Sequence, residues 1–217
     1  MDFVTMLSML TEGFVVTLQI FACTLVGALP LGVLVALCRM SRFTVLSALT
    51  RVYISIMRGT PLMLQLMFIY FAPWYVFGVQ LSTEWKFGAT IVAFVLNYSA
   101  YFAEIYRSGI QSIPVGQREA AQVLGYSRAQ TFMKIIMPQV IKRIIPAMGN
   151  EIIVLVKDTS LAFTIGVAEL FTTARAIVSS QGVLTAFIVA AAFYWVFTFV
   201  VEAIIARIEK RLSYYHD

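Results

Sequence analysis

Three polar side chains, Asn97, Tyr101 and Glu104, interrupt an otherwise apolar run, with spacings of four and three residues. That spacing places them on one face of a helix. Such a face can line a path for a polar solute, or it can bond a neighbouring helix, because polar groups in lipid are costly unless they are satisfied. We favour the path for Asn97, and for Glu104 we favour pairing with Arg107 one turn later.

A second group of polar residues lies in the run 135–156. Pro138, Pro146 and Gly149-Asn150 weaken its main-chain hydrogen bonding, which predicts a helix broken near the middle of a membrane. Glu151 stands beside that break, where a carboxylate can receive an ammonium group. The same carboxylate can instead cap the amino-terminal end of the resumed helix, and the sequence leaves both roles open.

Other reactive residue types do not form a catalytic or metal-binding pattern. Lys157 and Asp158 are adjacent, which is typical of a structural ion pair or a gate contact. Cys23 and Cys38 are 15 positions apart in one apolar run, about 22 Å along a helix, so they predict neither a disulfide nor a metal site. His216 is the sole histidine and has no catalytic partner nearby in the sequence. We therefore expect neither an enzyme nor a metalloprotein.

The composition indicates an integral membrane protein built from helices. Of 217 residues, 60% are hydrophobic and 12% are charged, and the mean hydropathy is +0.86. The net charge of +5 comes from short basic clusters between apolar runs, so it indicates membrane topology rather than nucleic-acid binding. Because a span needs about 20 apolar residues, we predict one all-α membrane domain, 1–217. Its five spans are expected near 14–38, 62–79, 87–106, 135–156 and 183–206, the last without interruption.

The basic residues between the spans also predict the orientation. Lysine and arginine in short loops favour the cytoplasmic side, which places the amino end outside and the carboxyl end inside. The acidic residues Asp158 and Glu169 then belong to an outward-facing connection. The residues assigned to the cytoplasm are Arg39, Arg42, Arg51, Arg58, Arg107, Arg118, Arg128, Lys134, Arg207, Lys210 and Arg211.

The loop 107–134 is polar and is expected to hold two short helices. The first runs from Val115 to Leu124 after Pro114, and Gly125 supplies a left-handed turn at its end. Ser127 and Gln130 have the spacing of a capping box that opens the second helix. From these residues alone, a helix pair lying on the lipid headgroups stays open as an interpretation.

The loop also resembles a known motif. Glu119-Ala120-Ala121, Gly125, Ile135 and Met137-Pro138 are spaced as in the EAA loop of permease subunits of ATP-binding cassette importers, with Met137 where leucine is usual. The resemblance extends over nearly the whole chain and is to the polar amino-acid branch of that family. The stretches that carry it are RGTPLMLQL at 58–66, NYSAYFAEIYRSGIQSI at 97–113 and GNEIIVLVKDTSL at 149–161.

This resemblance implies partners and a location. Glu119, Ala120, Ala121 and Gly125, with Ile135 and Pro138, would form a coupling helix segment that docks on a cytoplasmic ATPase, and that ATPase would hold ATP and Mg²⁺. It also implies a second permease chain, identical or different, an extracytoplasmic solute-binding protein and the bacterial cytoplasmic (inner) membrane. The chain has no Gly-Lys dipeptide and hence no phosphate-binding loop of the usual kind. A stand-alone secondary transporter or channel is the alternative, and it leaves the EAA loop unexplained.

The orientation predicts which side of the membrane reaches Ser127. A cysteine introduced at Ser127 is expected to react with an impermeant thiol reagent only from the cytoplasmic side, because the loop 107–134 is basic. Labelling of intact cells and of inverted vesicles measures this. Reaction from the outside would show that the predicted orientation is wrong.

Overall fold

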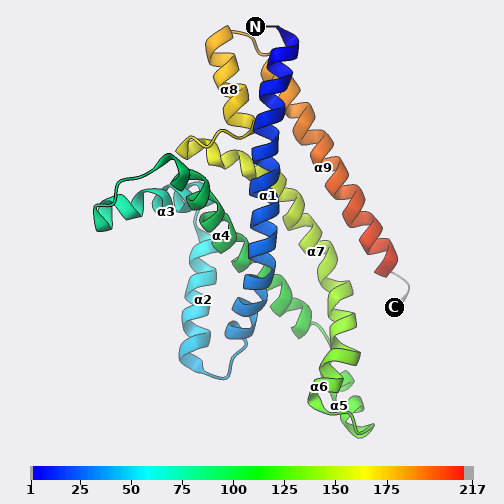
Figure 1. Cartoon of the computed structure of the whole chain (residues 1–217). Coiled ribbons are helices and arrows are strands. Elements are labelled where there is room, and N and C mark those ends of the chain that lie inside the picture. Colours follow the sequence, from blue (N-terminus) through cyan, green and yellow to red (C-terminus); the bar gives the residue numbers. More distant parts are fainter. Residues whose placement is uncertain (1, 213–217) are drawn as a thin grey trace.

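The computed structural model describes residues 2–212, and the secondary structure in that range is helical. Three helices are each long and apolar enough to cross a membrane: α1 (Phe3–Arg39), α4 (Thr83–Gln111) and α9 (Thr185–Leu212). Two bent pairs of helices raise the number of candidate spans in the described residues from three to as many as five. The predicted all-α membrane fold is therefore confirmed, and Figure 1 shows α1 running through the middle of the molecule beside α4 and α7.

The first bent pair replaces the straight second span predicted over 62–79. Helix α2 (Thr44–Gly59) and helix α3 (Leu62–Phe77) meet at 111°. Each has 16 residues, about 24 Å, which is too short to cross a membrane alone. Thr60 is extended before Pro61, as the proline ring requires of the residue that precedes it. Arg51 and Arg58, expected in a loop, lie within α2.

In the second bent pair, the helix break predicted near the middle of the fourth span is absent. Helix α7 (Met137–Asp158) runs without interruption through Pro146 and Gly149. Gly149 serves close packing instead, because a Cβ there would lie 2.5 Å from Cγ2 of Ile205 on α9. The irregular turns stand at the two ends of α7, as a π-helical turn, Thr131–Ile136, and a 3-10 segment, Thr159–Ile165. Helix α8 (Leu170–Gln181) then leaves at 54°.

Helix α1 forms the centre of the packing through a stripe of mostly small residues. At Gly32 a Cβ would lie 2.9 Å from Cβ of Phe102 and 3.2 Å from the carbonyl oxygen of Ser99, both on α4. Small residues at such contacts allow helix backbones to approach closely, which is how helices associate without a hydrophobic driving force in lipid. The buried residues of the stripe are Met6, Leu10, Gly13, Thr17, Ile20, Thr24, Ala28, Gly32 and Ala36.

Glu169, predicted to lie in a connection on the outer side of the membrane, is fully buried at the start of α8. Its carboxylate accepts the main-chain N–H groups of Phe171 and Thr172, both at 2.7 Å, and the hydroxyl of Tyr194 on α9 at 3.1 Å. The N–H of Leu170 bonds Oγ1 of Thr17 on α1 at 3.2 Å. The amino-terminal end of α8 is therefore joined to α1 and α9 by polar bonds rather than exposed.

The close α1–α4 contact predicts a position-specific loss of stability. Gly32→Ala is expected to destabilise the chain by about 1–3 kcal/mol, because the added methyl group must separate the two backbones. Thermal unfolding in detergent measures the change. Gly88→Ala is the control, since a Cβ there meets Trp85 at an ordinary 3.4 Å. Equal melting temperatures for the two variants would contradict the packing role.

Candidate functional site

A polar cavity of about 280 Å³ lies between the start of α3, α4 and α7. It brings together Asn97 and Tyr101 from the predicted third span, Glu151 from the predicted fourth span, and Asp158 from the connection that follows it. Asn97, Tyr101 and Glu151, the residues predicted to line a path, therefore border the same cavity. Glu151 lies within a continuous helix and caps no helix end. The lining residues are Thr60, Pro61, Leu62, Asn97, Tyr98, Tyr101, Glu151, Val154, Asp158 and Leu161.

Asn97 is 5% exposed and also holds the α2–α3 bend. Its Nδ2 donates to the carbonyl oxygen of Met57 at 3.0 Å and to Oε1 of Gln65 at 2.9 Å. Gln65 Nε2 in turn donates to the carbonyl oxygens of Met57 and Thr60 at 3.0 and 3.1 Å. These bonds satisfy main-chain carbonyls that the end of α2 leaves without helical partners. Asn97 therefore bonds a neighbouring helix and also lines the cavity, and its role in a path for a solute stays a prediction.

Asp158 and Lys157 do not form the ion pair that their adjacency suggested. In the described part of the chain, Asp158 faces the polar cavity and its Oδ2 accepts the hydroxyl of Tyr98 at 2.7 Å. Lys157 lines a different groove, towards α9. The reason is geometric, since neighbouring residues of a helix point about 100° apart. Tyr98 is separated from Asp158 by 60 positions, and no local pattern in the sequence could have found this contact.

Two acidic residues line the cavity, and one arginine lies against one of its aromatic lining residues. The guanidinium carbon of Arg58 lies 5.3 Å from the ring centre of Tyr101, in cation–π geometry. Glu151 and Asp158 bring two acidic groups to the lining of the same cavity. A small solute with both an ammonium and a carboxylate group could be held between these groups. Arg58 was missed as a residue of this site because a basic residue beside an apolar run indicates membrane topology first.

Glu104 and Arg107 form the ion pair favoured from the sequence. Nε of Arg107 lies 3.0 Å from Oε1 of Glu104, and Arg107 also bonds Gln111. Both side chains are about a quarter exposed. The pair therefore belongs to the surface of α4, and neither residue lines the polar cavity.

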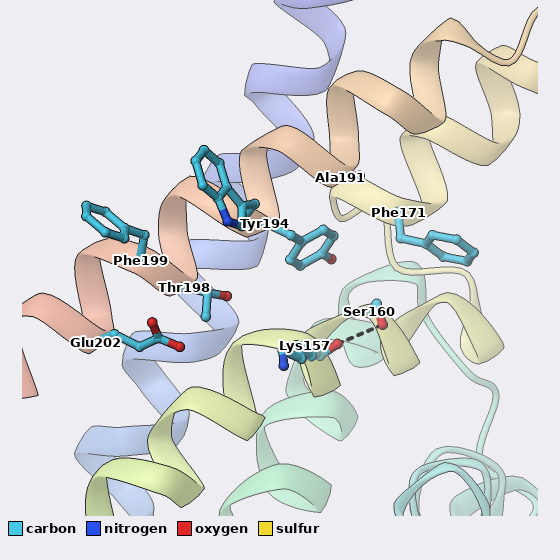
Figure 2. A pocket seen from close by; sticks show the side chains of 9 residues that line it. Lys157, Ser160, Phe171, Ala191, Tyr194, Thr198, Phe199 and Glu202 are labelled. Carbon is cyan, nitrogen blue, oxygen red and sulfur yellow. Dashed lines mark hydrogen bonds between the residues drawn. The ribbon is translucent and has the colours of Figure 1, made fainter.

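Figure 2 shows the second groove, of about 630 Å³, between the end of α7, α8 and α9. Lys157 and Glu202 line it together with aromatic side chains, among them Tyr194, Trp195 and Phe199. Glu202 lies five residues before Arg207, about 7 Å inside the span that the sequence indicated as uninterrupted. It was missed because one acid in a long apolar helix barely changes the hydropathy. Among residues 2–212, no cluster of three His, Cys, Asp or Glu side chains could hold a metal ion.

The polar loop forms a rigid projection at one end of α7. Helix α5 (Val115–Val123) ends at Gly125, whose φ of +79° is the left-handed turn expected there. The N–H groups of Tyr126 and Gly125 bond the carbonyl oxygens of Ala121 and Gln122, both at 3.0 Å, which makes a Schellman motif. Ser127 and Gln130 form the expected capping box at the start of α6 (Arg128–Gln130).

The loop presents one apolar face to its surroundings. Val123 and Leu124 are 89% and 74% exposed, and Glu119 and Ala120 are also exposed. Ala121 is buried, so it holds α5 against the chain rather than facing outward. Pro138 is exposed, and Ile135 packs against a small cluster that anchors the loop to α4 and α7. The members of that cluster are Ile113, Ile136 and Val140, with Ile110, Phe132, Ile135 and Ile144 around them.

Curated proteins resemble the chain over nearly its whole length. The glutamine transport system permease protein GlnP of Escherichia coli is 37% identical over 206 residues, 94% of this chain and 93% of that protein. The L-cystine and arginine transport system permease proteins of Bacillus subtilis, TcyB and ArtQ, are 38% and 35% identical. They cover 95% and 93% of this chain, and 87% and 91% of their own lengths.

Solved structures share the fold. The structure described as an amino acid ABC transporter with histidines superposes with a TM-score of 0.87, at 35% identity, over 97% of this chain and 99% of the other. The inward-facing MetNI methionine ABC transporter gives 0.73 at 18% identity, over 98% of this chain and all of the other, which is a likeness of fold alone. A family model described as the binding-protein-dependent transport system inner membrane component matches residues 28–214. The chain therefore belongs to this family of transport-system membrane components.

Proposed function

We propose that the chain is the permease subunit of an ATP-driven importer, and that it carries a polar amino acid delivered by an extracytoplasmic binding protein. One observation carries the proposal. A continuous helical run, Arg128–Ile165, joins the exposed loop at one end to Glu151 and Asp158 of the polar cavity near the other. A force applied at the loop is thereby transmitted along a helix to the cavity, which is what coupling to an ATPase requires.

The exposed face of α5 is the proposed docking surface for that ATPase. Val123 and Leu124 are too exposed to belong to a core, and Glu119 stands beside them on the same short helix. The Schellman turn and the capping box fix the shape of the segment before any partner arrives. A pre-ordered segment loses little entropy on docking, and it passes on a displacement instead of absorbing it. ATP and Mg²⁺ are held by the ATPase in this proposal.

A second permease chain is expected to cover part of the membrane-facing surface. Lys157 and Glu202 line an open groove and, among residues 2–212, make no ion pair with each other. Charged side chains at membrane depth normally face protein or a watery cavity, because hydrocarbon does not solvate them. Another subunit beside the groove would provide that environment, in the inner membrane of a bacterium. The amino end lies outside and the carboxyl end inside in this proposal.

The proposed cargo follows from the charges at the cavity. Glu151 and Asp158 suit the ammonium group of an amino acid, and Arg58 suits its carboxylate. The relatives are named for glutamine, arginine and L-cystine, whose side chains differ while these two groups are shared. Recognition of the shared groups explains how one cavity framework serves different amino acids.

Disruption of the turn at Gly125 tests the coupling. Gly125→Val is expected to lower ATP-dependent uptake at least about tenfold and to weaken retention of the ATPase in a mild-detergent pull-down. The reason is that a β-branched residue is strained at a φ of +79° and would change the angle of α5.

Gly182→Val is the matched control for that experiment. Gly182 has a φ of +68°, also with no atom within 4 Å of a Cβ, but it follows α8 rather than α5. The control should keep the ATPase and most of the uptake. If Gly125→Val retains both, or if no ATPase is recovered with the native chain, the coupling assignment fails.

Neutralisation of Glu151 tests the cargo site. Glu151→Gln preserves the shape and loses the charge, so the initial rate of amino-acid uptake into proteoliposomes should fall about 10- to 100-fold, as expected for a lost charged hydrogen bond. Glu12→Gln, at an exposed position of α1, is the control and should transport normally. Normal uptake by Glu151→Gln would show that the Glu151 carboxylate is not part of the cargo site.

A further inference from the structure

A third cavity, of about 370 Å³, lies at the turn between α1 and α2, away from the polar cavity and the α9 groove. Its lining includes two arginines, Arg42 and Arg51, and three hydroxyl groups, those of Ser41, Thr44 and Ser47. The two arginines and the hydroxyls of Ser41 and Thr44 can donate hydrogen bonds to a ligand, whereas the Ser47 hydroxyl already donates to the carbonyl oxygen of Arg39. Guanidinium groups beside hydroxyls supply the kinds of hydrogen-bond donor that bind a phosphate group.

No acid of the local sequence neutralises these arginines. Glu12 and Glu84 are consecutive acidic residues in the sequence, and four arginines lie between them. Arg42 and Arg51 are both exposed, and within residues 2–212 neither forms an ion pair or a side-chain hydrogen bond. The cavity therefore has a net positive charge that an anion from outside the chain would balance.

The cavity is held in shape by hydrogen bonds across the turn. Oγ of Ser47 on α2 donates to the carbonyl oxygen of Arg39 at 2.8 Å and accepts from Nη1 of Arg39 at 3.1 Å. Oγ of Ser41 accepts the N–H of Phe43 at 3.2 Å. The end of α1 and the start of α2 are thus fixed relative to each other, so the two arginines keep a stable separation of their backbones.

An exposed apolar stripe continues from the cavity along α2. Val45, Leu49, Val52 and Ile56 recur at helical spacing on one face, and they are 71%, 65%, 57% and 51% exposed. Val52 belongs to both the stripe and the cavity lining. A ligand that fills the cavity with its phosphate is therefore placed to lay an apolar chain on the stripe.

We propose that this cavity binds the phosphate of an anionic phospholipid, with an acyl chain along the stripe of α2. Free phosphate would satisfy the arginines but would leave the stripe uncovered, and a zwitterionic lipid would leave the positive charge unbalanced. Figure 1 shows the α1–α2 turn at the same end of the molecule as α5 and α6, the end assigned to the cytoplasmic leaflet. The proposal requires only that the chain is in a membrane and does not rest on its role as an importer.

Native mass spectrometry of the full-length chain in detergent tests the proposal, with dioleoylphosphatidylglycerol as the probe. The native chain should bind it more tightly than dioleoylphosphatidylcholine, which has the same acyl chains and no net charge. Each arginine near a membrane surface contributes about 1 kcal/mol, so Arg42→Gln or Arg51→Gln should weaken binding about 5-fold and the double variant about 30-fold.

The matched control is the double variant Arg207→Gln with Arg211→Gln, which removes the same charge from exposed positions at the end of α9. It should bind phosphatidylglycerol within about twofold of the native chain. Melting temperatures without lipid check the fold, and the two single variants decide the question if the double variant does not fold.

Three results would overturn the proposal. They are unchanged binding by the Arg42→Gln and Arg51→Gln variants, equal loss in the α9 control, and equal affinity for the two lipids. Inorganic phosphate that binds the native chain as tightly as phosphatidylglycerol would assign the cavity to a free anion instead. If the arginines prove essential only for retention of the ATPase, the surface is a protein contact.

Discussion

Polar groups within a bilayer are costly unless they find partners within protein or at a watery cavity, because hydrocarbon offers none. The α2–α3 bend shows the consequence most clearly. A helix that stops at Gly59 and resumes at Leu62 leaves carbonyl groups without helical partners. Asn97 and Gln65 supply the missing donors. The bend, and the cavity that the bend opens beside Thr60 and Pro61, depend on these two amide side chains.

The same constraint explains why the polar cavity and the helix packing are built from one set of residues. Asn97 joins α4 to α2, and Tyr98 beside it joins α4 to Asp158 on α7. The cavity therefore lies where three elements are already tied together by hydrogen bonds. In the proposed importer, a displacement of α7 would alter the Tyr98–Asp158 contact and with it the walls of the proposed cargo site.

The irregular turns of the Arg128–Ile165 run separate its rigid part from its ends. Helix α7 stays regular through Pro146 and Gly149, and the π-helical and 3-10 turns lie just beyond it on either side. Gly149 lets α9 approach and Gly32 lets α1 approach α4, so close backbone contacts hold the long helices together. The exposed α5 segment, by contrast, is attached through a small apolar cluster around Ile136. The fold thus combines closely packed long helices with a projecting α5 segment, whose exposed residues are the proposed docking surface.

The sequence by itself determined the helical membrane class, the left-handed turn at Gly125 and the capping box at Ser127, because hydropathy and turn chemistry are local properties. It also indicated Asn97, Tyr101 and Glu151 as candidate site residues, because polar side chains are rare in apolar runs. Only the tertiary structure decided that α2 and α3 form a bent pair, that Gly149 is a packing site rather than a break, and that Glu169 is buried. It also decided that Asp158 accepts a hydrogen bond from Tyr98, and that Lys157 lines the same groove as Glu202. These outcomes depend on which helix lies opposite each residue, and a single sequence read along its length does not contain that information.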